Sequence, residues 1–207
     1  MKVVLTIAGS DSSGGAGIQA DLKTFEAFGV FGTSAITVLT AQNTQGVQDI
    51  HEVDVNFILK QITAVLEDFD VAAIKIGMLY SKDIIEAIEA VIKNLDIPIV
   101  IDPVFISKVG SLLLQKNAVE AMTKLFEYAT VITPNMHEAS KLFGLGGNTP
   151  VVDLHSLPCP ALIKHHVMET EEGTMSVDKL VHDGKELSFA SPMIDTTSLH
   201  GTGCSYS

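Results

Sequence analysis

Short apolar runs alternate with segments of helical spacing along the first three quarters of the chain. Residues 3–8 form an apolar run, and in the following segment Ile18, Leu22, Phe25 and Phe28 fall on one helical face. The same alternation predicts strands at 3–8, 34–40, 72–76, 97–101, 130–133 and 161–164, and helices at 16–28, 55–69, 83–93, 117–128 and 135–143. Continuous apolar strands separated by helices are typical of a parallel sheet covered on both faces. We therefore predict an α/β fold with a mostly parallel central sheet.

The last quarter of the chain has a different pattern. Residues 144–160 contain three of the seven prolines and a Gly-Gly pair, with no clear period. The runs 177–181 and 186–190 flank Asp183-Gly184, and Asp-Gly between two such runs is a strong hairpin signal. We therefore predict an antiparallel C-terminal hairpin. A chain of 207 residues, 46% of them hydrophobic, fits a single domain over 1–207.

Charge and cysteine content narrow the classes of function. The net charge of −12 argues against nucleic acid, and it means that a polyphosphate must be held locally by backbone N–H groups, a few lysines and a metal. Cys159 and Cys204 form no Cys-x-x-Cys pair, which indicates a reducing compartment. The N-terminal apolar run is too short for a signal peptide, and no run reaches the length of a membrane span. We expect a cytoplasmic protein with no membrane partner.

Polar residues lie at or near the predicted strand ends, where parallel sheets bind their ligands. The residues placed on this edge are the Gly/Ser-rich loop at 9–17, Gln42, Gly77-Met78, Asp102 and Asn135. Asp21, one turn into the first helix, either favours the helix N-terminus or binds a hydroxyl or amine of a small substrate. Gln42 offers a donor and an acceptor, which suits an amino-substituted heteroaromatic ring, or else it caps the strand end.

Acidic and basic residues at later strand ends suggest a phosphate site. Asp102 ends an apolar strand, and Mg²⁺ prefers one or two carboxylates together with phosphate oxygens. Asn135 and Glu138 form a second oxygen cluster, or else belong to a helix start capped by Thr133. Lys164 closes a strand on the same side, where it either holds a phosphate or is solvated.

The segment Gly201-Thr202-Gly203-Cys204 is a candidate anion site. Glycines around a threonine let successive backbone N–H groups converge on one point, and a helix that starts there would add its positive end. A thiol at the rim can act on the group that carries the anion. The alternative is a Gly-rich turn with an incidental cysteine, because so short a match is not specific.

Six motifs occur together and in a fixed order. They are AGSDSSGGAGIQADLKTF at 8–25, TVLTAQNTQGV at 37–47, KIGML at 75–79, IDPV at 101–104, TPN–HEA at 133–139 and HGTGC at 200–204. With these motifs the chain resembles the hydroxymethylpyrimidine/phosphomethylpyrimidine kinases of thiamine biosynthesis, a branch of the ribokinase-like superfamily. The similarity runs from residue 2 to about 143 and resumes at 162–164 and 177–204.

The resemblance implies a ribokinase-like three-layer αβα sandwich, a homodimer, and transfer of the γ-phosphate of ATP to the hydroxymethyl group of a pyrimidine and then to the monophosphate. It places the pyrimidine contacts on Gly9, Asp21, Gln42, Met78 and Val104. It places the catalytic base on Cys204, and an anion hole on Gly201, Thr202, Gly203 and Cys204. It places Mg²⁺ at Asp102 and Glu138, and ATP at Asn135, Lys164 and Thr202, with Lys164 as the phosphate-binding lysine.

The chain also departs from the family pattern. His165 and His166 stand where the family usually has two glycines, which is expected to narrow the nucleotide site or alter loop motion; on a strand they point to opposite faces and do not share a metal. Residues 144–160 are shorter and richer in proline than the family's helix there. We expect either that the family's C-terminal helices after the GTGC loop are missing or that the polypeptide is longer, and an intact mass of 22.1 kDa would favour the short form.

Two other functions stay open. Pyridoxal kinases are similar proteins that usually carry aspartate where Cys204 stands, although some bacterial ones share the cysteine; Gln42 and its AQNT context argue against that substrate. The second alternative is a truncated pyrimidine-binding module without catalysis.

Overall fold

A nine-stranded sheet organises the computed structural model, which describes residues 1–105, 113–145, 151–171, 173–196 and 200–207. Its strand order is β3-β2-β1-β4-β5-β6-β7-β8-β9. The strands are β1 (Val3–Asp11), β2 (Phe31–Asn43), β3 (Gly46–Glu52), β4 (Val71–Ile76), β5 (Ile99–Ile101), β6 (Val131–Ile132), β7 (Ala161–Thr170), β8 (Gly173–His182) and β9 (Lys185–Pro192). The run from β2 to β7 is parallel, whereas β3 and the β7-β8-β9 end are antiparallel. The mostly parallel sheet and the antiparallel hairpin at Asp183-Gly184 are confirmed.

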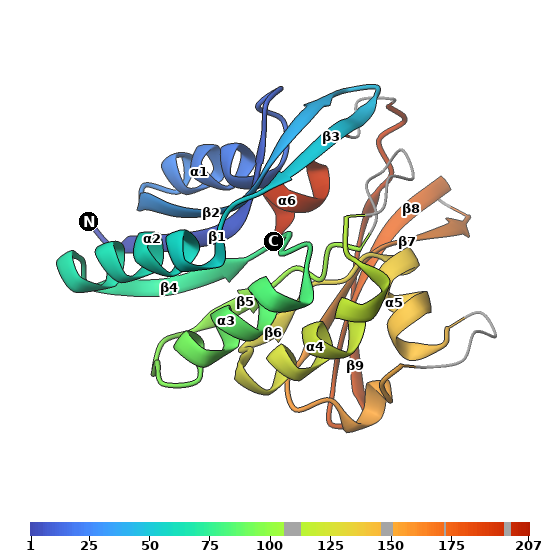
Figure 1. Cartoon of the computed structure of the whole chain (residues 1–207). Helices are drawn as coiled ribbons and strands as arrows, with labels where there is room; N and C mark the ends of the chain where they lie inside the picture. The colour runs from blue at the N-terminus through green and yellow to red at the C-terminus, as the bar shows by residue number, and fades with distance from the viewer. Residues whose placement is uncertain (106–112, 146–150, 172, 197–199) are drawn as a thin grey trace.

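Helices cover both faces of the sheet. They are α1 (Gly17–Ala27), α2 (Val55–Asp68), α3 (Lys82–Ile92), α4 (Val119–Lys124), α5 (Met136–Phe143) and the short α6 (Thr202–Tyr206). Figure 1 shows α1 and α6 on one side of the sheet and α2 to α5 on the other, and this agrees with the contacts between α1 and α6 and along the row α2-α3-α4. The predicted three-layer sandwich is therefore confirmed. None of the helices in the described ranges has the length and apolar content that crossing a bilayer requires.

Side chains of the central strands are buried on both sides of the sheet. On one face, Leu5 and Ile7 on β1 and their partners Ile74 and Ile76 on β4 are at most 1% exposed, and on the other face Thr6 and Ala8 of β1 are 0% exposed. This explains why these strands are continuous apolar runs in the sequence. The β1-β2, β1-β4 and β4-β5 pairs are parallel, so their carboxyl ends meet at one edge of the sheet.

Several predictions of secondary structure were incomplete, and β1 and β2 extend beyond their predicted ends at 8 and 40 to Asp11 and Asn43. Strand β3 was not predicted, because it is an edge strand whose residues are exposed or half-buried and mostly polar. Strand β7 continues beyond its predicted end at 164 to Thr170, again through exposed residues. The helix predicted at 117–128 is divided into α4 and two flanking 3₁₀ turns, Lys116–Ala118 and Leu125–Tyr128. The predicted irregular stretch 144–160 contains the 3₁₀ turn Leu154–Ser156, and residues 146–150 lie outside the described part.

Candidate active site

Two adjoining cavities open at the carboxyl ends of the central strands. The larger has a volume of about 110 Å³ and the smaller about 60 Å³. They share five lining residues: Ala16, Gln42, Val104, Leu113 and Cys204. The thiol of Cys204 therefore belongs to the boundary between the two spaces.

Most of the predicted site residues line these cavities. Gly9 and Met78 line the smaller one, whereas the larger one is lined by Asp102, Asn135, Glu138, Lys164, Gly201 and Gly203, and both by Gln42, Val104 and Cys204. Asp21 and Thr202 line neither. The structure thus gathers segments from across the chain at one edge of the sheet, and the individual roles given to these residues stay predictions.

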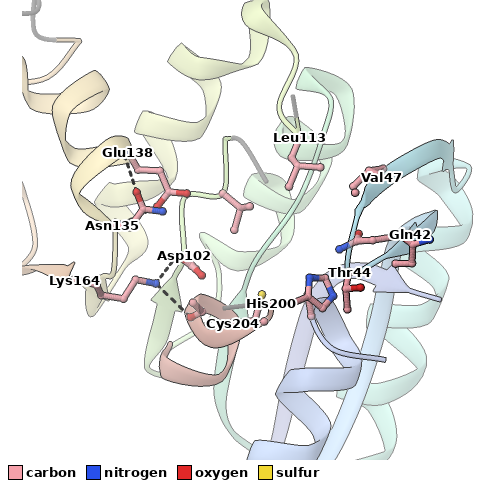
Figure 2. A pocket seen from close by; sticks show the side chains of 16 residues that line it. Gln42, Thr44, Val47, Asp102, Leu113, Asn135, Glu138, Lys164, His200 and Cys204 are labelled. Carbon is pink, nitrogen blue, oxygen red and sulfur yellow. Dashed lines mark hydrogen bonds and ion pairs between the residues drawn. The ribbon is translucent and has the colours of Figure 1, made fainter. Parts of the chain in front are cut away.

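The larger cavity contains a buried ion pair. Lys164 Nζ lies 3.0 Å from Asp102 Oδ1 and donates a hydrogen bond to the Gly203 carbonyl at 3.3 Å, as Figure 2 shows. Lys164 is 5% exposed and Asp102 is 3% exposed, so the solvated alternative for Lys164 is excluded. Ser207 Oγ donates to the other Asp102 oxygen at 2.9 Å. The lysine thus links the end of β5 to the GTGC segment.

Asn135 and Glu138 have a structural role at the start of α5. The Asn135 side chain accepts from the backbone N–H groups of His137 and Glu138, and Glu138 Oε2 accepts from Asn135 N at 2.9 Å. This capping box satisfies N–H groups that the helix itself cannot. The cap is therefore Asn135, and the alternative of a cap at Thr133 was wrong because the chain becomes helical two residues later than that alternative required.

Asp102 and Glu138 suit a cation shared with phosphate. Burial, followed by repulsion from Asp102, raises the pKa of Glu138 to about 8. A divalent cation would relieve this repulsion, and Mg²⁺ commonly binds through one or two carboxylates, phosphate oxygens and water. The described residues contain no cluster of three or more His, Cys, Asp or Glu side chains suited to a metal. The residues therefore fit a cation that arrives with phosphate, and they do not form a complete protein cage.

A second buried ion pair, between Lys75 and Asp21, lies beside the smaller cavity. Lys75 Nζ contacts Asp21 Oδ1 at 2.7 Å, and the Thr6 hydroxyl donates to Asp21 Oδ2 at 2.5 Å. Asp21 is 2% exposed, whereas Lys75 lines the cavity. The structure thus puts Lys75 where sequence analysis placed Asp21. The signal for Lys75 was a lone lysine in the apolar run VAAIKI, a position where burial requires a partner.

The surroundings of Cys204 both raise and lower the pKa of its thiol. Burial raises the pKa of Cys204, and the charge of Lys75 and a hydrogen bond from the Gly17 backbone lower it without cancelling the effect of burial. Gly17 is the first residue of α1, so the sulfur faces the N-terminus of that helix. For Lys75, burial opposes the charged form, but attraction by Asp21, Cys204 and Asp102 outweighs it and raises the pKa of the ammonium.

The two histidines at 165 and 166 lie away from the cavities. His165 has a φ of 61°, a left-handed conformation that favours glycine, at a bulge between Ile163 and His166 of β7. Its N–H donates to Asp178 Oδ1 at 2.8 Å, and its Nδ1 lies 2.9 Å from Ser176 Oγ. Neither histidine lines either cavity. The expected narrowing of the site by their side chains is therefore not seen in the described residues.

Comparisons with known proteins agree with this architecture. Over its whole length the chain is 45% identical to a hydroxymethylpyrimidine/phosphomethylpyrimidine kinase of Haemophilus influenzae and covers 81% of that protein. A crystal structure of phosphomethylpyrimidine kinase from Clostridium difficile superposes with a TM-score of 0.76 at 41% identity, covering 91% of this chain and 84% of the other. Pyridoxal kinase of Bacillus subtilis in complex with ADP superposes with a TM-score of 0.83 at 38% identity, covering 100% and 81%.

The sequence profile of one kinase family includes almost the whole chain. The profile described as phosphomethylpyrimidine kinase matches residues 11–207, which include most of the Gly/Ser-rich loop, the whole lining of the larger cavity and the GTGC segment. The chain is a kinase and belongs to the phosphomethylpyrimidine kinase family.

Proposed function

We propose that this protein phosphorylates 4-amino-5-hydroxymethyl-2-methylpyrimidine, and then its monophosphate, with ATP and Mg²⁺. The observation that carries the proposal is the position of Cys204 between two cavities of different chemistry. The smaller cavity has apolar walls from Met78 and Val104 and suits an aromatic ring. The larger cavity has Lys164, Asp102 and Glu138 and suits a triphosphate with its cation.

The proposed reaction moves one proton and one phosphoryl group. The hydroxymethyl oxygen attacks the γ-phosphorus, the bond from phosphorus to the ADP oxygen breaks, and the hydroxyl proton passes to the sulfur of Cys204. Cys204 must be a thiolate to accept it, and Lys75 and the Gly17 N–H both favour that form. Negative charge on the transferred group is stabilised by Lys164 and by the backbone N–H groups of Gly201 to Cys204.

Asp102 and Glu138 are the residues proposed to hold Mg²⁺. When bound with ATP, the ion would neutralise charge on the phosphate oxygens. Lys164 is already paired with Asp102, so a phosphate bound here would interact with the Lys164 ammonium while that ammonium also contacts Asp102. Asn135 marks the nucleotide side of the same cavity.

Pyridoxal is the second candidate substrate, because the pyridoxal kinase of Bacillus subtilis superposes so well on this chain. The test is incubation with each alcohol in turn, with ATP and Mg²⁺, followed by mass analysis of the products. Pyrimidine mono- and diphosphate are the expected products. Accumulation of pyridoxal phosphate with unreacted pyrimidine would assign the second substrate instead, and binding of the pyrimidine without ATP turnover would indicate a binding module.

A homodimer in the cytoplasm completes the proposal. It is supported by the family resemblance and by an aromatic surface at the start of β2, where Phe28 is 80% exposed and Phe31 is 45% exposed and stacks on Phe69. Sedimentation velocity should give about twice the chain mass, and Phe28→Ser should lower the dimer fraction. A monomer at micromolar concentration would contradict the assignment.

A further inference from the structure

The carboxylate of Asp11 organises the loop that follows β1. Asp11 is 3% exposed, and its Oδ1 accepts from the backbone N–H of Ser13 at 2.8 Å. Its Oδ2 accepts from the N–H groups of Gly15 at 3.0 Å and Ala16 at 2.8 Å. Hydrogen bonds to the charged form, those of His200 and Ser13 first, outweigh burial and lower the pKa of Asp11. The loop is thus held around a carboxylate.

The same carboxylate reaches the other end of the chain. His200 Nε2 lies 2.7 Å from Asp11 Oδ2 and 3.3 Å from Ser13 Oγ. The His200 ring packs so closely on Gly15 that a Cβ there would overlap it, and a Cβ on Gly201 would overlap the Gly15 carbonyl. Residues 11–16 and the GTGC segment are therefore in direct backbone contact, and the Asp11–His200 pair is the side-chain bond across that contact.

The loop also holds the residue proposed to recognise the pyrimidine. Ser12 Oγ donates to the Gln42 carbonyl at 2.8 Å and accepts from the Gln42 N–H at 2.9 Å. Figure 2 shows His200 between Cys204 and the segment that carries Gln42 and Thr44. A continuous set of contacts therefore leads from Gln42 through Ser12, Asp11 and His200 to the GTGC segment.

We propose that His200 is a positioning residue, which through Asp11 holds the backbone N–H groups and the thiol of the GTGC segment in register with the pyrimidine cavity. This inference rests on the proposed function. Its physical basis is that misplacement of reacting groups by about 1 Å can cost roughly a hundredfold in rate. The imidazole suits the task because a rigid ring carries an N–H donor across to Asp11 while its face covers Gly15. His200 also lines the larger cavity, but its Nε2 is directed at Asp11 and Ser13, so the histidine acts on the reaction through the loop that it holds.

The test compares three substitutions at one position. His200→Ala removes the ring and the donor, His200→Asn has an amide that is too short to reach Asp11, and His200→Gln restores an N–H at about the distance of Nε2. We expect the kcat for the pyrimidine to fall about 10- to 100-fold in the first two, following the cost of misplacement. The Gln variant should recover most of it. The Kd for the pyrimidine, measured by calorimetry without ATP, should stay within about twofold. His155→Ala, an exposed histidine on a 3₁₀ turn, is the matched control.

A second readout does not depend on kinase activity. Peptide-resolved alkylation by iodoacetamide should become at least fivefold faster at Cys204 in the Ala and Asn variants and stay slow in the Gln variant, with buried Cys159 as the internal reference. A failed pyrimidine assay with the wild-type chain would remove the proposed function and leave this measurement intact. Equal kcat and equal alkylation in all variants would overturn the inference. So would a Gln variant no better than Asn, or a loss of pyrimidine affinity that matches the loss of kcat. Should the Ala variant not fold, the comparison of Asn with Gln decides.

Discussion

The buried ion pair Lys75–Asp21 should contribute strongly to the stability of the fold. At 2.7 Å and an effective dielectric constant of about 20, the attraction is about 6 kcal/mol before desolvation. Removal of one partner of a buried pair typically costs about 3–5 kcal/mol, because the other charge stays buried without compensation. Asp21 is 2% exposed, and within the described part of the chain it would retain the hydrogen bond from the Thr6 hydroxyl but no counter-ion. We therefore expect Lys75→Met to lower the free energy of unfolding by about 3 kcal/mol, the lower end of that range.

The assay is a double-mutant cycle in urea. Asp21→Asn should cost a similar amount, since it leaves the Lys75 ammonium buried with a neutral partner. The double variant Lys75→Met/Asp21→Asn should cost clearly less than the sum of the two single changes, because neither charge then stays buried alone. Additive effects of the two changes would refute the reasoning. The exposed i,i+4 pair Lys82–Glu86 is the control, and its disruption should change stability by less than about 1 kcal/mol.

Three further outcomes follow from the site. Cys204→Ala should lower kcat by about 10²–10⁴, the usual contribution of a general base, with the pyrimidine Kd nearly unchanged when measured by calorimetry. Because burial raises the pKa of the Cys204 thiol above its ordinary value of 9.0, the thiolate fraction and hence kcat/KM should rise about tenfold per pH unit from pH 7 to 8.5. Gly201 and Gly184 both have a left-handed backbone, with φ of 77° and 70°. A Cβ added at Gly184 would meet nothing within 4 Å, whereas a Cβ added at Gly201 would overlap the Gly15 carbonyl. Gly184→Ala should therefore cost only the backbone strain of about 1–2 kcal/mol, and Gly201→Ala should cost more and abolish turnover.

Each of these outcomes has a result that would contradict it. Wild-type rates in Cys204→Ala would remove the thiol from the mechanism. A pH profile that is flat between 7 and 8.5 would mean that thiol ionisation does not limit the rate. Equal thermal unfolding of the two glycine variants would show that the GTGC segment yields to the added methyl group.

The fold followed from hydrophobic periodicity because the central strands are buried on both faces. Leu5 and Ile7 on one face of β1 and Ala8 on the other are all fully buried, so β1 leaves a continuous apolar signal. Edge strands escaped prediction where one face is in water, as in β3, or where exposed residues dominate, as in the outer half of β7. Periodicity reports burial, so it is silent where a strand is stabilised mainly by hydrogen bonds to its neighbour.

The sequence predicted which residues lie at the site better than it predicted which residues contact one another. Strand ends placed Gln42 and Lys164 at one edge, the family motifs added Cys204, and all three line the larger cavity. The partner of Asp21 was missed because 54 positions separate it from Lys75, and local spacing does not report such pairs. The bond between Asp11 and His200 spans 189 positions and was missed for the same reason.

The contact between residues 11–16 and the GTGC segment has a consequence for how the enzyme matures. During synthesis the strands β1, β2 and β4, which carry most of the proposed ring-binding residues, are made many residues before Cys204, the proposed base. The residues proposed to bind the ring are therefore made well before the residue proposed to deprotonate the alcohol. Recovery of turnover after dilution from denaturant should accordingly lag behind recovery of the far-ultraviolet signal, since the GTGC segment must return to the loop after β1.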